Sequence, residues 1–250
     1  MKNTALQICL IILLTTFTTQ AQNEARQAEA DNIQGVAQIN GGRYEAALES
    51  LNRAIRLQPD YPKAFYNLGT AHFHLKQFEK AIEAFQKAIK LFPAYTEAYN
   101  QLGVAYTETA QYKEAIDAFE KAIRLKPDSA NAFYNLGCLY IRLKKFKEAG
   151  AALEKARRLA PENAETRLNL GYSYSRQKRY REAISEIQKA VSLNQNDSDA
   201  QFLLGNLYLL AKDKQSALAQ YEKIKSLNPA LAQKLYQSIY GDKLLTVSYP

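Results

Sequence analysis

The chain has 250 residues, of which 47% are hydrophobic and 23% are charged, a globular composition that excludes wholesale disorder. Two cysteines and two histidines exclude a scaffold stapled by several disulfides and a zinc site built from these residues alone. The formal net charge of +8 is the only hint of an acidic partner that the composition offers.

Residues 1–21 have the pattern of a secretory signal peptide. Lys2 supplies a positive charge, Leu6–Phe17 is mostly apolar, and Thr19-Gln20-Ala21 places small residues around a cleavage site. The apolar stretch is shorter than the roughly 20 residues that a membrane-spanning helix needs. We therefore expect cleavage between Ala21 and Gln22 and an exported protein, periplasmic or secreted; an uncleaved N-terminal anchor is the alternative.

A repeat of 34 residues fills most of the remaining chain. Glycines and alanines recur at this interval, and five of the six units also carry a proline near their end. The repeats are preceded by a short segment, 22–27, and followed by a capping helix and tail, 232–250. The recurring residues are Gly35, Gly69, Gly103, Gly137, Gly171 and Gly205, with Ala47, Ala81, Ala115, Ala149, Ala183 and Ala217; the six units are 28–61, 62–95, 96–129, 130–163, 164–197 and 198–231.

Each repeat, with positions numbered 1–34, predicts two amphipathic helices. Phe65, Leu68 and His72 have the spacing of one helical stripe, and Ala81 and Phe85 begin a second. The glycine at position 8 costs about 0.5–1 kcal/mol against alanine in a helix. We expect this loss to be offset because the second helix approaches closely there, with the alanine at position 20 facing the glycine. A leucine at position 30 should end the second helix.

This pattern resembles the tetratricopeptide repeat family, and units two to four match it best, with Phe65, Tyr99 and Phe133 at its aromatic position. The resemblance implies an all-α, right-handed superhelical solenoid of antiparallel helix pairs. It also implies a non-catalytic scaffold or adaptor for protein partners. Polar residues in the first helix of repeat one suit an end cap. Leu231, Leu235 and Ile239 predict a single capping helix that ends at Gly241.

The sequence offers no recognisable catalytic, metal-binding or cofactor-binding motif. His72 and His74 are two residues apart on one predicted helix, so they face different directions and cannot share a metal. The glycines lie within helices, not in a phosphate-binding loop, and no histidine lies in a matching frame near Cys138. We therefore expect neither an enzyme nor a cofactor.

Basic residues concentrate in the turns between the two helices of repeats four and five. One interpretation is that they are solvated turn residues that complement helix C-termini. A nucleic-acid surface is disfavoured by the expected export, and contact with an anionic membrane surface is a further alternative. The two sets are Arg142, Lys144, Lys145 and Lys147, and Arg176, Lys178, Arg179 and Arg181.

The resemblance implies that the first helices line a concave face, where an extended peptide or protein segment would bind. Asparagines at position 6 either hold a peptide backbone or only solvate the helix face. Arg142 and Arg176 either hold an anionic group beside Tyr134 and Tyr172 or only complement helix ends. The alternative function is a binding module for cell-wall glycan or anionic lipid, through tyrosines and the basic turns. The expected partner-binding residues are Tyr66, Asn67, Thr70, Phe73, His74, Asn100, Thr107, Glu108, Asn131, Tyr134, Asn135, Cys138, Arg142, Leu168, Asn169, Tyr172, Ser175, Arg176, Phe202 and Asn206.

Overall fold

The computed structural model describes the backbone of residues 2–241 and the side chains from Thr19 to Gly241. The side chains of the apolar stretch Leu6–Phe17 and the tail 242–250 lie outside the described residues. Every regular element in the described range is an α-helix, as the repeat pattern predicts. Within the range whose side chains are described, no helix has both the length and the apolarity to cross a bilayer.

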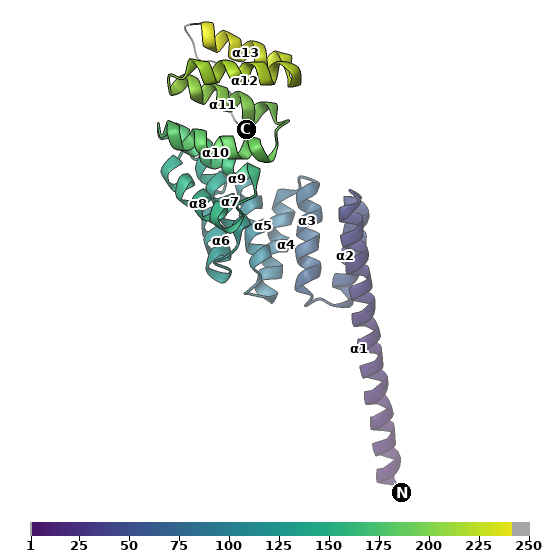
Figure 1. Ribbon diagram of the computed structural model, residues 1–250. Coiled ribbons are helices and arrows are strands. Elements are labelled where there is room, and N and C mark those ends of the chain that lie inside the picture. Colours follow the sequence, from purple (N-terminus) through teal and green to yellow (C-terminus); the bar gives the residue numbers. More distant parts are fainter. Residues whose placement is uncertain (1, 242–250) are drawn as a thin grey trace. The chain divides into compact units, whose positions relative to one another are not determined.

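The helices alternate as the first and second members of the repeats, and they lie antiparallel in neighbouring pairs (Figure 1). Each second helix ends at the leucine of position 30, which confirms the predicted boundary. The first helices are α1 (Lys2–Asn40), α3 (Pro62–His74), α5 (Thr96–Glu108), α7 (Ala130–Arg142), α9 (Ala164–Arg176) and α11 (Ser198–Leu210). The second helices are α2 (Tyr44–Leu57), α4 (Phe78–Leu91), α6 (Tyr112–Leu125), α8 (Phe146–Leu159), α10 (Tyr180–Leu193) and α12 (Lys214–Leu227), and α13 (Pro229–Tyr240) follows.

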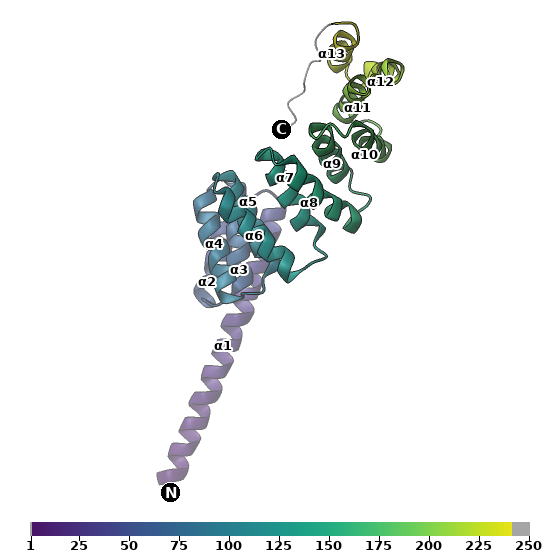
Figure 2. The same ribbon diagram turned by 90° about the vertical axis from the view of Figure 1, so that its left-hand side faces the viewer.

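The chain divides into two compact units, an N-terminal unit of residues 1–125 and a C-terminal unit of residues 126–250. The N-terminal unit holds α1 to α6, and the C-terminal unit holds α7 to α13. In both views each helix of the C-terminal unit lies beside the next one in sequence (Figures 1 and 2). Each unit is thus a stack of helix pairs with a core of its own.

Helix α1 extends beyond the first repeat toward the N-terminus. It runs without a break through Ala21 and Gln22, both of which are exposed. Residues 19–27 are all exposed, and Ala28 is the first buried residue among those whose side chains are described. The packed part of the chain therefore begins where the first repeat was predicted to begin.

The glycines at position 8 lie where two helices come closest. A Cβ atom built on Gly103 would lie 2.6 Å from Cε1 of Phe119, and the glycines of repeats one, two, four and five meet the side chain at the same position. That side chain stands at position 24 of the repeat, in the second helix. The predicted contact with the position-20 alanine is therefore corrected, since position 24 supplies the nearest atoms; in repeat five the carbonyl oxygen of Ala183 also lies 3.1 Å from the Cβ position. The reason is size, since only the larger residue reaches across to the glycine, whereas the small alanine is buried beside it.

The last repeat differs because α13 supplies its missing neighbour. A Cβ atom on Gly205 would lie 2.6 Å from Cδ2 of Leu235 in α13, not near the second helix of its own repeat. Leu235 and Ile239 are buried with Phe202 in one core cluster. The predicted capping helix is confirmed, and it ends one residue before Gly241.

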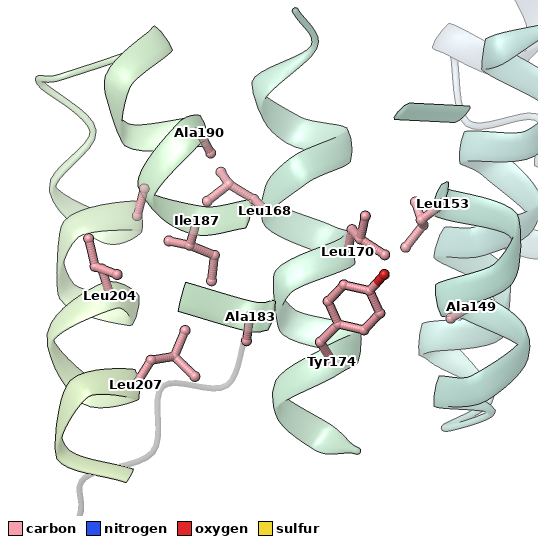
Figure 3. Close-up of a cluster of buried hydrophobic side chains, with 11 residues drawn as sticks. Ala149, Leu153, Leu168, Leu170, Tyr174, Ala183, Ile187, Ala190, Leu204 and Leu207 are labelled. Atoms are coloured by element: carbon pink, nitrogen blue, oxygen red, sulfur yellow. The ribbon is translucent and has the colours of Figure 1, made fainter. Parts of the chain in front are cut away.

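The core of the C-terminal unit is continuous across successive helices (Figure 3). Leu170 of α9 lies between Leu153 of α8 and Ile187 of α10, and Leu204 of α11 extends the same cluster. A buried ionic cluster accompanies this core, because Glu186 accepts hydrogen bonds from Arg157 at 2.6 Å and from Arg167 at 2.8 Å. Pairing with the two arginines offsets the free-energy cost of removing this carboxylate from water, and it links α8, α9 and α10.

The turn inside every repeat uses a left-handed residue at position 15. Gly42 holds this position in repeat one with φ of 71°, but lysine or alanine holds it in the others. The following N–H bonds back to the carbonyl of position 11, as from Gln77 to His72 at 2.9 Å. This arrangement is a Schellman-type helix end, which usually carries glycine. The lysines in this series are Lys76, Lys144, Lys178 and Lys212, with Ala110 in repeat three.

Candidate partner-binding surface

The first helices of the N-terminal unit carry a half-buried aromatic group. The Tyr66 ring lies 5.1 Å from that of Tyr95 and 5.8 Å from that of Phe85. Burial raises the pKa of the Tyr66 hydroxyl, so this group stays protonated and able to donate a hydrogen bond. Phe73 packs edge-on against Phe78 at 5.4 Å. Phe85 is buried in the core, and the other four rings are partly exposed above it.

Position 13 of a first helix stacks on the aromatic residue at position 17 of the preceding repeat. His74 lies flat on Tyr44, with ring centroids 4.7 Å apart and an interplanar angle of 7°. Arg176 follows the same rule in the C-terminal unit, with its guanidinium 4.9 Å from the Phe146 ring and 5.9 Å from the Tyr172 ring. The side chains at the end of the first helix are therefore held in place by the neighbouring repeat.

The position-6 asparagines connect neighbouring repeats. The Nδ2 of Asn67 donates to Oδ1 of Asn32 at 2.8 Å, and the Nδ2 of Asn169 donates to the Tyr134 hydroxyl at 3.2 Å. In both cases the acceptor is the position-5 side chain of the preceding repeat. One amide donor of each asparagine is thus used within the protein, a role that neither sequence interpretation included.

A polar group joins α7 and α9 on the first-helix face of the C-terminal unit. The Tyr134 hydroxyl donates to a carboxylate oxygen of Glu165 at 3.4 Å, and Asn169 also lies 3.5 Å from the sulfur of Cys138. Burial raises the pKa of the Cys138 thiol to about 11. The thiol is therefore protonated at neutral pH, which does not suit a nucleophile.

Three of the predicted contact residues lie in the core. Leu168, Phe202 and Asn206 are each at most 9% exposed, and Phe202 is 1% exposed. Phe202 is covered because α13 packs against α11. If a further repeat stood in place of α13, this face of α11 would remain open. These three side chains offer no contact surface to a partner in this arrangement.

The remaining predicted residues line the face in different ways. Thr70, Thr107 and Ser175 donate their hydroxyl hydrogens to carbonyls of their own helices, so each hydroxyl group already has a hydrogen-bond acceptor. Asn131 and Arg142 are exposed, and Asn100 and Asn135 are partly exposed. Glu108 is exposed at the end of α5. Further interactions within the chain involve Asn100, Thr107, Glu108, Asn135 and Arg142.

Comparison with known proteins identifies the architecture. A family model described as "Cilia and flagella-associated protein 70 C-terminal domain", a tetratricopeptide repeat domain, matches residues 7–235. The chain belongs to this tetratricopeptide repeat family. No curated protein matches the chain.

Solved structures of tetratricopeptide repeat proteins share the fold. PilF of Pseudomonas aeruginosa is 21% identical, with a TM-score of 0.75 over 86% of this chain and 99% of that one. YrrB, described as a tetratricopeptide repeat protein with an unusual peptide-binding site, is 26% identical, with a TM-score of 0.65 over 76% of this chain and 99% of that one. MamA of Desulfovibrio magneticus RS-1 is 26% identical, with a TM-score of 0.61 over 68% and 97%.

In this tetratricopeptide repeat protein, sequence reasoning missed the aromatic residues that support the first-helix face. Tyr44, Tyr95 and Phe146 belong to second helices or to loops, yet their rings contact first-helix side chains. The recurring aromatic at position 17 was the available signal. Among the residues whose side chains are described, no group of three histidine, cysteine or acidic residues is placed to hold a metal.

Proposed function

We propose that this protein is a non-catalytic scaffold that holds an extended peptide or protein segment on the first-helix face. The tetratricopeptide repeat family supplies protein-binding scaffolds, and YrrB, described with a peptide-binding site, is 26% identical over most of both chains. In the C-terminal unit the segment would cross α7 and α9 and place a carboxylate at Arg176.

The position of Arg176 carries this proposal. Its side chain is exposed, while the rings of Phe146 and Tyr172 hold the guanidinium from one side and the Tyr172 hydroxyl accepts from its Nη1 at 3.4 Å. A guanidinium that is fixed in this way loses less side-chain entropy when it binds a carboxylate. Its remaining N–H groups match a carboxylate in a bidentate geometry.

A double substitution tests the proposal. Arg142→Ala with Arg176→Ala should lower capture of protein partners from native cell extract at least tenfold, which corresponds to about 1.4 kcal/mol. Thermal stability should change little, because both arginines are exposed. The matched control is Arg56→Ala with Arg158→Ala. It removes two exposed arginines that stand at position 29 of their repeats, near the ends of second helices. Unchanged capture together with lost stability would show that Arg142 and Arg176 are structural.

We also propose that the protein is exported after cleavage between Ala21 and Gln22. The charge and apolar pattern of residues 1–21 supports cleavage. Removal of these residues would leave the packed core intact, since burial begins at Ala28. N-terminal sequencing of the protein from its native cells should find Gln22 first; a chain in the cytosolic fraction that begins at Met1 would refute export.

A further inference from the structure

Six exposed cations occupy the turns between the paired helices of the C-terminal unit. We call this set the basic edge; none of its members forms an ion pair with any residue whose side chain is described. The left-handed turn places three of the lysines at its tip. The basic edge consists of Lys144, Lys145, Lys147, Lys178, Arg181 and Lys212.

The three turns that carry these residues are neighbours in space. Gln177 at the end of α9 donates to the carbonyl of Phe146 at the start of α8, at 2.8 Å. The next two turns together line an open hollow of about 450 Å³, with Lys178 and Arg181 on one side and Lys212 on the other. The cations therefore follow one line across repeats four, five and six.

Helix electrostatics account for only half of this line, because Lys144, Lys178 and Lys212 follow the C-terminal ends of first helices, where cations are favourable. Arg142 and Arg176 end first helices, where cations are favourable, but Lys145 is the N-cap of α8, and Lys147 and Arg181 lie in the first turns of α8 and α10. A helix N-terminus favours anions, so cations there are unfavourable for the helix. Repeats one and two instead carry Glu45 and Glu79 at the corresponding first-turn position.

The carboxylate of Glu182 lines the hollow but does not neutralise the cations there. Glu182 is bonded to Arg179, whose guanidinium also lies 4.0 Å from the Tyr174 ring. This contact lowers the pKa of Glu182. Lys178, Arg181 and Lys212 form no ion pair with any residue whose side chain is described. Tyr180 and Leu210 add apolar walls to the same hollow.

We propose that the basic edge binds an acidic, extended segment of a protein partner. A line of cations across three turns matches a chain that carries several Asp or Glu side chains, and the hollow with its apolar walls accepts a side chain. A planar bilayer surface would use the cations but not the hollow. The basic edge contains neither Arg142 nor Arg176, so this inference rests on other side chains than the proposed peptide site does.

Direct binding to a defined probe tests the inference in the full-length protein. The probe is a fluorescein-labelled oligoglutamate peptide, titrated at about 0.1 M salt, where charges beyond about 10 Å are screened. Lys144→Gln, Lys178→Gln and Lys212→Gln together should weaken binding at least tenfold. The control combines Lys76→Gln, Lys80→Gln and Lys113→Gln, three exposed lysines in a turn or in the first turn of a second helix of the N-terminal unit, and should change affinity less than twofold.

Each outcome of this experiment supports or overturns the proposed site for an acidic segment. A large loss in the basic-edge variant alone supports the site, and circular dichroism that matches the unsubstituted protein shows that the fold is kept. Equal losses in both variants would mean that only net charge matters, which overturns the inference. No binding of the peptide, combined with binding to phosphatidylglycerol-containing phosphatidylcholine vesicles that the basic-edge variant loses, would instead assign the surface to lipid.

Discussion

Cys138 shows how neighbouring groups determine the chemistry of a single side chain. It lies between two hydrogen-bonding residues, Tyr134 and Asn169, from the first helices of repeats four and five. Burial raises its pKa to about 11, because the thiolate would lose hydration that its neighbours do not fully replace. In a chain with two cysteines, this one has the environment of a structural residue.

We expect Cys138 to react slowly with iodoacetamide at pH 8 in the folded protein. The thiolate is the reacting form, so a pKa of about 11 lowers its population on the order of a hundredfold below that of a free cysteine. The rate should rise with each pH unit up to about 11, since the thiolate fraction rises tenfold per unit below the pKa. Mass spectrometry of the peptide that contains Cys138 measures the rate, and the protein unfolded in guanidinium is the control. Equal rates in both states would contradict the assignment.

At the scale of a helix pair, contact between positions 8 and 24 fixes the separation. A Cβ atom on Gly69, Gly103 or Gly137 would come within 2.6–2.7 Å of the facing side chain, closer than real Cβ contacts occur. The glycine therefore lowers the helix propensity of its segment but allows the two helices to pack closely. Gly150 in α8 is different, since the nearest atom to a Cβ there is Nε2 of Gln177, the far end of a side chain, at 3.2 Å.

Gly103→Leu should destabilise the protein because the new side chain must displace the Phe119 ring. Overpacking costs about 1–3 kcal/mol, and we expect the upper end here, since the backbone of α5 must also move. Gly150→Ala is the matched control and should stay within about 1 kcal/mol of the parent protein. Chemical denaturation measures both. An unchanged midpoint for Gly103→Leu would show that the glycine has no packing role.

The period of the sequence predicts the helices and their ends, because a buried stripe, a polar turn and a terminal leucine recur in each repeat. It does not predict which side chain meets the glycine, since the period places both Ala115 and Phe119 on the same stripe. Contacts between repeats were also missed, as with Arg176 on Phe146, because they depend on how the helix pairs stack. Phe202 was expected at a surface because nothing in its own repeat indicates that α13 covers it.

At the scale of the whole molecule, each core cluster joins helices that are close in sequence. The cluster around Leu235 joins α11, α12 and α13, whereas that around Leu51 joins α1, α2 and α3. Stability in such an array is the sum of local terms, so a defect should loosen its own neighbourhood first.

Leu235→Ala should open the C-terminal end and leave the N-terminal unit unchanged. Truncation of a buried leucine costs about 2–5 kcal/mol, so amide hydrogen exchange in α11–α13 should accelerate at least tenfold. Hydrogen exchange read by mass spectrometry locates the effect. Leu51→Ala, the matched variant at the other end, should loosen α1–α3 instead. Uniform acceleration along the chain in either variant would mean that the molecule unfolds as one cooperative body.

The replacement of a seventh repeat by α13 restricts how this chain could lengthen during evolution. Leu235 of α13 fills the space beside Gly205, where repeats one to five place the position-24 side chain of their own second helix. A copy appended after α13 would therefore meet α13 and not the second helix that a middle repeat presents to its successor. A duplicated unit inserted among repeats two to five would bring its own pairing of position 8 with position 24, and it would meet a second helix on one side and a first helix on the other, as its neighbours do. Growth by internal duplication therefore preserves both ends of the array, and divergence between sister proteins should appear as a different number of middle repeats.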